Sequence, residues 1–426
     1  MAISRREFVQ WVPLAAAGAA ATAAFDGYAA TGDSAGRVVV IGGGYGGATA
    51  AKYIKRWAPD IAVTLVERDG EFVSCPISNL VLGGNADIRD LSFSYDGLRR
   101  HGIAVVRDEA IAVDAVRREV RLAGGGVLGY DRLIAAPGVE ILVDSIPGLD
   151  NADAQSRVLH AWKAGAQTVA LRRQLESMRD GGVYAVHLPL EPFRCPPAAY
   201  ERVCQVADYF TRAKPRSKIL VLDSNEDILS KKALFLAAWN GQYKGMIEYR
   251  PNSELVEVDA KTLTAKLQFE DVRADVLNVI PPQKAGAIAA RAGLINANNR
   301  WCIVDWTTLE STAAKGIHIL GDATMSGPAM PKSATMANQH AKVCAAAVIA
   351  LIKGEAVNPQ PVMTNTCYSF VDGRQGMHVA SVHVYDRTEK TMVPVKGAGG
   401  LSDKASEQEG VYAWGWARNI WADTLA

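Results

Sequence analysis

Six cysteines carry the most reactive chemistry in this sequence, at positions 75, 195, 204, 302, 344 and 367. No two of them form a CxxC pair, which argues against an adjacent dithiol and against a zinc site. The sequence also contains no CxxCH motif, so we expect no c-type haem attached to this chain and no metal. Thiol chemistry remains, and the surrounding residues divide the six cysteines into two groups.

Three of the cysteines lie where they would pack in the interior. Cys204 and Cys344 fall inside predicted helices among apolar neighbours, and Cys302 lies in a strand-like stretch. Free cysteine often behaves as a small buried apolar residue. We therefore interpret these three as structural.

The other three cysteines stand in less regular surroundings. Cys195 lies in the glycine-free stretch "EPFRCPP" before a predicted helix, and Cys367 lies in the loop-like "MTNTCYSF". A disulfide between them would close a long loop, but two unrelated thiols or a purely structural disulfide also fit. Glu201, in the first turns of that helix, is either a proton acceptor or an exposed glutamate favoured by the helix dipole. Cys75, in "GEFVSCPISN", is either structural or placed beside a cofactor.

A glycine motif near the N-terminus predicts the element that would position such a cofactor. Gly42, Gly44 and Gly47 form GxGxxG between a buried strand predicted at 38–41 and an Ala-rich helix. Such glycines allow a tight turn and bring a pyrophosphate close to a helix N-terminus. Glu67 ends the next predicted strand about 20 residues further on, where a carboxylate binds the adenosine ribose. The sequence therefore predicts a dinucleotide site.

Two further segments favour FAD over NAD at this site. "YDRLIAAPG" ends in Pro137 and Gly138, and "GIHILGDAT" contains Gly321 and Asp322. These resemble the extra fingerprints of FAD enzymes with the glutathione-reductase architecture, in which the aspartate binds a ribityl hydroxyl. In that architecture the next helix, predicted to begin near Pro331, directs its positive end at the flavin. Lys332 then either helps to stabilise reduced flavin or is an exposed first-turn lysine.

A second unit repeats the strand–helix–strand order but lacks the glycines. Strands are predicted at 181–190 and 217–225, with a helix at 198–213 between them. The connecting "EPFRCPP" contains prolines, which have no amide hydrogen and fix their backbone, so this turn cannot wrap a pyrophosphate. We expect this domain to have lost its nicotinamide nucleotide.

Composition and the N-terminus limit the class of protein. The chain has 426 residues, 49% of them hydrophobic, which is enough for two or three domains, and a net charge of +1 gives no case for nucleic acid. Arg5 and Arg6 precede a weakly apolar, Ala-rich run, which is typical of a twin-arginine export signal and predicts a folded, cofactor-loaded protein in the periplasm. We expect no membrane insertion of the mature chain, and we interpret "KVCAAAVIALIKG" as core.

The predicted fold is α/β, with two Rossmann-like dinucleotide-binding domains in a glutathione-reductase-like arrangement and a C-terminal α+β domain. In the C-terminal domain, the alternation of Tyr412, Trp414 and Trp416 predicts a strand with one aromatic face, used for core packing or for a partner contact. The predicted domains are the signal (1–34), the FAD domain (35–148 and 290–358), the degenerate NAD-like domain (149–289) and the C-terminal flavin cover and partner interface (359–426).

These segments together resemble the flavin subunit of flavocytochrome c sulfide dehydrogenase over nearly the whole chain after the signal. "PFRCPPAAYER" and "NTCYS" are the most specific pieces, supported by "GYDRLIAAPG", "MPKS" and "YAWGW". The resemblance implies a redox disulfide between Cys195 and Cys367 above the flavin. It also implies FAD attached covalently to Cys75 through the 8α-methyl carbon, and Glu201 as a base.

The same resemblance implies the reaction and the partner. Sulfide would be oxidised to sulfur or polysulfide, and electrons would pass through FAD to a separate c-type cytochrome subunit, usually dihaem. One alternative is a sulfide:quinone oxidoreductase, which shares the fold and the disulfide. The tail argues against it, because it has few basic residues and little helical periodicity. A second alternative is a non-catalytic flavin electron-transfer subunit.

Overall fold

The first sheet combines stretches of chain that are far apart in the sequence. The computed structural model describes residues 34–426, so the predicted export signal with Arg5 and Arg6 lies outside the described residues. The sheet has the order β19-β9-β1-β2-β5, and all neighbours are parallel. Its strands are β1 (Arg37–Ile41), β2 (Ala62–Glu67), β5 (Ala104–Arg107), β9 (Arg132–Ala135) and β19 (Ile317–Ile319).

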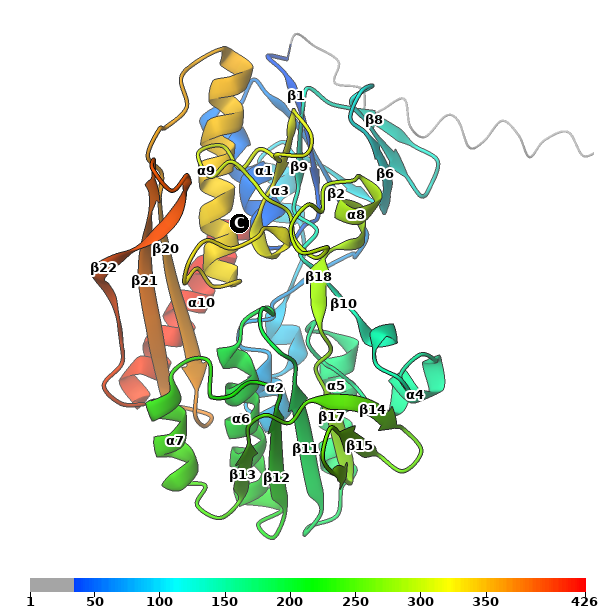
Figure 1. The fold of residues 1–426 in the computed structure, drawn as a ribbon. Coiled ribbons are helices and arrows are strands. Elements are labelled where there is room, and N and C mark those ends of the chain that lie inside the picture. The colour runs from blue at the N-terminus through cyan, green and yellow to red at the C-terminus, as the bar shows by residue number, and fades with distance from the viewer. Residues whose placement is uncertain (1–33) are drawn as a thin grey trace, which may run out of the picture. The chain divides into compact units, whose positions relative to one another are not determined.

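Helices and a small meander cover this sheet. The valines of β1 are almost completely buried, as expected for a central parallel strand with both faces covered. Helices α1 (Tyr45–Trp57) and α9 (Ala334–Lys353) pack against each other (Figure 1). The meander consists of β6 (Ala110–Asp114), β7 (Glu119–Leu122) and β8 (Val127–Gly129). The strand–turn–helix order predicted around the glycine motif is confirmed.

Helix α9 is longer than the apolar stretch identified in the sequence. Among the described residues it is the one helix whose length and composition would suffice to cross a membrane. More than half of its apolar window is buried, and it packs against α1 and against strand β20 (Val362–Phe370). These contacts are typical of a core helix.

The second parallel sheet has the order β13-β12-β11-β17. Its strands are β11 (Val183–Leu188), β12 (Lys218–Asp223), β13 (Ile247–Arg250) and β17 (Val276–Val279), with helices α5 (Ala166–Ser177), α6 (Pro197–Ala213) and α7 (Lys232–Asn240). The predicted strand–helix–strand unit is β11-α6-β12, with β11 and β12 paired in parallel. The glutathione-reductase-like α/β class is therefore confirmed.

Shorter elements connect these layers. The antiparallel pair β10 (Val139–Ile141) and β18 (Gln283–Ala285) carries the chain into and out of the second sheet (Figure 1). The remaining strands are β3 (Phe72–Val73), β4 (Ser92–Phe93), β14 (Leu255–Asp259), β15 (Thr264–Leu267) and β16 (Asp271–Arg273). The remaining helices are α2 (Asn79–Gly83), α3 (Asp96–Arg100), α4 (Ala152–Arg157) and α8 (Ala287–Arg291), with 3-10 turns at 88–91, 143–145 and 321–323.

The C-terminal domain is an antiparallel sheet followed by a helix. Strand β20 pairs with β21 (Gly376–Asp386), which pairs with β22 (Thr391–Leu401), and α10 (Glu407–Leu425) packs against β21 (Figure 1). The strand predicted across Tyr412 to Trp416 is wrong, because these residues lie within α10. Ser406 caps the helix by accepting a hydrogen bond from Glu409 N at 3.2 Å. The buried residues of α10 follow helical spacing at 413, 417, 420 and 421.

Candidate active site

One cavity brings together most of the residues that the sequence singled out. It lies at the carboxyl ends of β1, β2 and β9, the edge at which parallel α/β sheets bind ligands. Its walls include nine of the predicted site residues, Gly44, Glu67, Cys75, Gly138, Cys195, Glu201, Gly321, Asp322 and Cys367. The lining does not include Gly42, Gly47, Pro137 or Lys332.

The glycine turn shows why each glycine is needed. Gly42 has a φ of +97°, and a Cβ there would lie 2.4 Å from the carbonyl oxygen of Ala136. A Cβ on Gly47 would lie 1.9 Å from the carbonyl oxygen of Gly42. Nothing lies within 4 Å of the Cβ position of Gly44, which leaves open space at the cavity wall. Gly42 and Gly47 therefore build the turn, whereas Gly44 leaves room for a pyrophosphate.

Two carboxylates provide acceptors for a dinucleotide. Glu67 lines the cavity and accepts hydrogen bonds from Gly43 N at 2.6 Å and Asp69 N at 2.9 Å. Asp322 Oδ1 is buried and has no hydrogen-bond partner among the described residues. Burial raises the pKa of Asp322, and the positive charges of Arg194 and Lys332 oppose that rise. A ribityl hydroxyl could donate the hydrogen bond that this buried oxygen lacks, so the residues present fit FAD.

The start of α9 faces the same cavity. Ser333 caps the helix by accepting from Met336 N at 3.0 Å, and Ala334, Thr335 and Ala337 line the cavity. The positive end of the helix dipole is therefore near the ligand space, as predicted. The helix begins at Ala334, three residues later than the predicted start at Pro331.

Lys332 is not the exposed first-turn lysine of the second alternative. It is buried rather than exposed, and its Nζ donates to the carbonyl oxygens of Asp322 (3.0 Å) and Thr324 while lying 3.8 Å from the ring centroid of Trp301. Burial lowers the pKa of Lys332 to about 8. Its backbone carbonyl accepts a hydrogen bond from Cys195 N at 3.0 Å. Lys332 therefore supports the turn that carries Cys195.

Cys195 and Cys367 line the same cavity from different elements. Cys195 has a φ of +53° just before α6, and Cys367 lies in β20 with its Sγ donating to Asn365 Oδ1 at 3.4 Å. Burial raises the pKa of Cys195, and the charge of Cys367 adds to that rise. All six cysteines are free thiols in the structure, so the disulfide stays a prediction.

Cys75 occupies the cavity wall between β3 and α2. Its Sγ accepts hydrogen bonds from Arg194 Nη1 at 3.4 Å and from Ala164 N at 3.5 Å. Arg194 is held in place by donating through Nη2 to the carbonyl oxygen of Trp162. The sequence left open whether Cys75 is structural or lies beside a cofactor. Its place in the cavity wall supports the second alternative.

Glu201 is a buried carboxyl group. It is 6% exposed, which excludes the alternative of an exposed first-turn glutamate. Its oxygens accept hydrogen bonds from Asn79 Nδ2 at 2.7 Å and from Phe370 N at 2.8 Å. Burial raises the pKa of Glu201, while these two hydrogen bonds oppose the rise. The group is therefore able to hold a proton next to the two thiols.

Residues 194–197, which lead into α6, offer no free amide to a phosphate. Arg194 N donates to Gln283 Oε1 at 3.0 Å and Cys195 N to Lys332 O, while Pro196 and Pro197 have no N–H. Asp223, at the end of β12, sits where NAD enzymes keep a ribose-binding acid. It is completely buried and accepts from the hydroxyl groups of Tyr200 (2.8 Å) and Tyr249 (3.1 Å).

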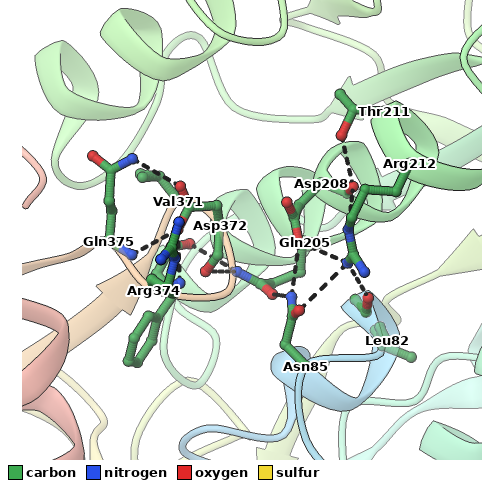
Figure 2. Close-up of polar contacts among 12 residues, drawn as sticks. Leu82, Asn85, Gln205, Asp208, Thr211, Arg212, Val371, Asp372, Arg374 and Gln375 are labelled. Carbon is green, nitrogen blue, oxygen red and sulfur yellow. Dashed lines mark hydrogen bonds and ion pairs between the residues drawn. The ribbon is translucent and has the colours of Figure 1, made fainter. Parts of the chain in front are cut away.

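A polar network joins the elements that carry the three thiols (Figure 2). Asn85, after α2, donates to Gln205 Oε1 (3.1 Å) and Asp208 Oδ2 (2.8 Å) on α6. Gln205 Nε2 donates to the carbonyl oxygen of Asp372 (2.8 Å) in the β20–β21 turn, and Arg212 Nη2 donates to Asp208 at 2.9 Å. Because α2 follows Cys75, α6 follows Cys195 and β20 contains Cys367, the network fixes these segments against one another.

The three remaining cysteines are buried, as predicted for packing residues. Cys204 accepts a hydrogen bond from Trp239 Nε1 at 3.2 Å, and burial raises its pKa. Burial raises the pKa of Cys302 to about 12 and also raises that of Cys344. None of the three lines the cavity.

Sequence reasoning missed four residues at the site. Arg194 and Asn79 contact predicted residues, Trp416 lines the cavity from α10, and Lys231 donates to the carbonyl oxygen of Cys367. The position of Arg194, directly before Cys195, is a signal that could have identified it. Lys231 is followed by Lys232, and nothing in the sequence distinguishes the buried lysine from the exposed one.

Three family models match the chain. Residues 36–176 match "Pyridine nucleotide-disulphide oxidoreductase", residues 168–281 match "Sulfide dehydrogenase [flavocytochrome c] flavoprotein chain, central", and residues 359–425 match "Flavocytochrome c sulphide dehydrogenase, flavin-binding". A relative from Chlorobaculum thiosulfatiphilum, "Sulfide dehydrogenase [flavocytochrome c] flavoprotein chain", is 60% identical over 45 residues, which are 11% of this chain and 94% of the relative. The chain belongs to the flavocytochrome c sulfide dehydrogenase flavoprotein family. It is therefore a flavin-binding oxidoreductase.

More distant relatives share the fold of this flavoprotein. The mitochondrial sulfide:quinone oxidoreductase of Mus musculus is 23% identical over 304 residues, which are 67% of this chain and 65% of that protein. The solved sulfide:quinone oxidoreductase of Aquifex aeolicus superposes with a TM-score of 0.76 at 17% identity, covering 91% of each chain. At these identities the likeness concerns the architecture alone.

Proposed function

We propose that this chain is the sulfide-oxidising flavin subunit of a periplasmic flavocytochrome c, with a dihaem c-type cytochrome subunit as electron acceptor. The observation that carries the proposal is that Cys195 and Cys367 line the same cavity as Gly44, Glu67 and Asp322, the residues predicted to bind FAD. The twin-arginine pattern supports export of the folded protein, and the absence of CxxCH supports a haem carried by another chain.

In the proposed reaction, Cys195 and Cys367 form a disulfide that HS⁻ attacks at one sulfur. The bond between the two cysteines breaks, a new S–S bond joins the sulfide to the attacked cysteine, and the electron pair of the broken bond stays on the other sulfur as a thiolate. We place the persulfide on Cys195 and the thiolate on Cys367. The disulfide re-forms when the S–S bond of the persulfide breaks: its outer sulfur leaves as sulfur, its proton is released, and two electrons are given up, so that HS⁻ is converted to sulfur, a proton and two electrons. When bound, FAD would supply the acceptor for these two electrons and their one-electron transfer to haem.

Glu201 is proposed to take the proton in this reaction. Its carboxyl group is buried among Asn79 and Phe370, and its charge acts on Cys195. Burial raises its pKa, so its conjugate acid is more stable than that of a solvent-exposed glutamate. Proton uptake therefore takes place inside the cavity, close to the thiols.

The test is an anaerobic titration of the flavin-loaded protein with sulfide, followed by flavin absorbance. We expect bleaching at close to one sulfide per flavin, with a long-wavelength thiolate–flavin band. NADH, added in parallel, should leave the absorbance unchanged. A flavin that does not respond to sulfide would overturn the proposed function.

A sulfide:quinone oxidoreductase is the second candidate, because the C-terminal segment is a helix rather than the predicted strand. On α10, Val411 is 66% exposed and Tyr412 is 54% exposed, so the argument from missing helical periodicity no longer holds. The two functions differ in the oxidant. Sulfide-dependent reduction of cytochrome c without reduction of a short-chain ubiquinone supports the flavocytochrome, and the opposite result supports the quinone enzyme.

A further inference from the structure

The lysine at the start of α7 is buried next to the thiol pair. Lys231 is 5% exposed and has a left-handed backbone, with a φ of +55°. The next residue, Lys232, has a side chain that is 53% exposed and forms an ion pair with Asp227 at 2.5 Å. Because an ammonium group loses its hydration on burial, a lysine in this position requires local compensation.

Polar atoms of β20 provide that compensation. Lys231 Nζ donates to the carbonyl oxygen of Cys367 at 2.9 Å and to Ser369 Oγ at 2.8 Å. An ammonium has three hydrogens, so one N–H has no partner among the described residues. The lysine therefore anchors β20 at Cys367 and at Ser369, two residues further along the strand.

No carboxylate neutralises Lys231 by direct contact. Within residues 34–426 Lys231 forms no ion pair. The carboxylate oxygens of Glu201 instead accept hydrogen bonds from Asn79 Nδ2 and Phe370 N. The titratable groups that face Lys231 are Cys367 on β20, Cys195 before α6, Glu201 on α6 and Glu409 on α10. Glu409 in turn is bound by His378 Nδ1 at 2.9 Å. Burial lowers the pKa of Lys231, and the negative charges of these neighbours, Cys367 first among them, oppose that fall and favour the ammonium form.

We infer that Lys231 is a positioning residue for the proposed sulfide reaction: it fixes β20 at Cys367 and supplies the buried positive charge that favours thiolate over thiol at the Cys195–Cys367 pair. The inference rests on the proposed function for its role in turnover. When the disulfide is broken, the departing sulfur carries the electron pair of the S–S bond, and a nearby cation stabilises that charge. Two cations act on Cys195: Arg194, which donates a hydrogen bond to Cys75 Sγ and has the larger effect, and Lys231.

The thiolate fraction can be measured without any turnover. In the reduced, flavin-loaded protein, the rate of alkylation of Cys367 by iodoacetamide is followed from pH 5 to 10 by peptide mass spectrometry. In Lys231→Gln, which removes the charge but keeps a donor, we expect the midpoint to rise by about one pH unit, which is about tenfold slower alkylation below the midpoint. Lys231→Arg should stay close to the wild type, and Lys232→Gln, the neighbouring exposed control, should be unchanged.

The controls separate this inference from a general loss of structure. Lys231→Met fills a similar volume without charge, so it replaces Lys231→Gln if that variant does not fold, and the same midpoint shift is expected. An unchanged midpoint in a folded, flavin-loaded charge-removing variant would overturn the role of Lys231, even if the wild type is reduced by sulfide. A wild type that ignores sulfide, with the midpoint shift present, would overturn the proposed function and support the electrostatic effect of Lys231.

Discussion

At the residue scale, the buried carboxyl group of Glu201 predicts a pH effect. Burial raises its pKa above the ordinary 4.5, so the proton-accepting carboxylate is lost as the pH falls through that raised value. In wild type, sulfide-driven flavin reduction should therefore slow on the acid side. Glu201→Gln should be slower by about 10²-fold or more, typical of losing a general base, and should lack this acid limb.

Rates of both proteins measured by stopped flow at each pH give this comparison directly. Dividing the wild-type rate by the variant rate at each pH cancels the effect of sulfide ionisation, which is the same for both proteins. A ratio that does not change with pH would contradict the assignment of Glu201 as proton acceptor. Thermal unfolding of the variant serves as the control for folding.

The position of Cys75 leads to a prediction about covalent attachment of the flavin. If FAD is bound through Cys75, Cys75→Ser should still bind FAD through the glycine turn and Asp322, but acid precipitation should release all of it into the supernatant. In the wild type, the flavin should stay with the precipitated protein. Flavin fluorescence of the two fractions measures this. Complete release from the wild type as well would contradict a covalent link.

Several site residues could be predicted because each has a local reason for its identity. The glycines of the turn and Asp322 follow a strand at fixed spacing, so the sequence alone places them. Lys231, Lys332 and Arg194 could not be oriented in the same way. Whether a lysine is buried depends on which strand passes beside it, and for Lys231 that strand is β20, far away in the sequence.

At the element scale, the N-cap of α9 carries both stability and the orientation of the helix toward the cavity. Ser333 Oγ accepts from Met336 N and donates to Asn365 Oδ1 at 2.6 Å, and both groups are buried. Ser333→Ala removes the cap of Met336 N and leaves Asn365 Oδ1 with only the Cys367 thiol as donor, and it should lower the free energy of unfolding by about 1–3 kcal/mol. Urea unfolding measures this, with Ser177→Ala on the exposed surface of α5 expected to change it by less than about 0.5 kcal/mol. Equal effects of the two variants would contradict the role of the cap.

The elements themselves differ in how far the sequence determines them. Buried strands such as β1, followed by glycines and a helix, carry both an apolar pattern and a turn signal, and they were predicted. Helix α10 was not, because alternating aromatic residues at 412, 414 and 416 match a strand while the alanines at 413 and 417 match a buried helical face. The structure resolves this in favour of the face that packs against β21 and α1.

At the scale of the whole molecule, the second sheet keeps the architecture of a nucleotide domain without its binding groups. The amides of Arg194 and Cys195 are hydrogen-bonded, Pro196 and Pro197 have none, and Asp223 accepts hydrogen bonds from two tyrosine hydroxyls. NADH at millimolar concentration should therefore neither bleach the flavin nor raise the Tm. Absorbance and thermal-shift measurements check both, with FAD-loaded glutathione reductase and NADPH as the positive control. Bleaching by NADH would contradict the loss of this site.

The fold class could be predicted from the order of strands, helices and glycine turns along the chain. The assembly of one cavity from α1, β2, α6, α9, β20 and α10 could not be predicted, because it depends on packing between segments separated by hundreds of residues. The resemblance to a family supplied what the local pattern lacked, namely that Cys195 and Cys367 act together. The structure places both at one cavity and leaves their oxidation to experiment.

The most direct test of the central claim compares two cysteine variants of the flavin-loaded protein in the anaerobic sulfide titration. Cys195→Ser removes a thiol at the cavity, whereas Cys204→Ala removes a buried thiol from the same helix region without touching the cavity. We predict that sulfide no longer reduces the flavin of Cys195→Ser within the time that suffices for the wild type, and that Cys204→Ala is reduced normally. Normal reduction of a folded Cys195→Ser protein by sulfide would contradict the claim that electrons enter through the thiol pair.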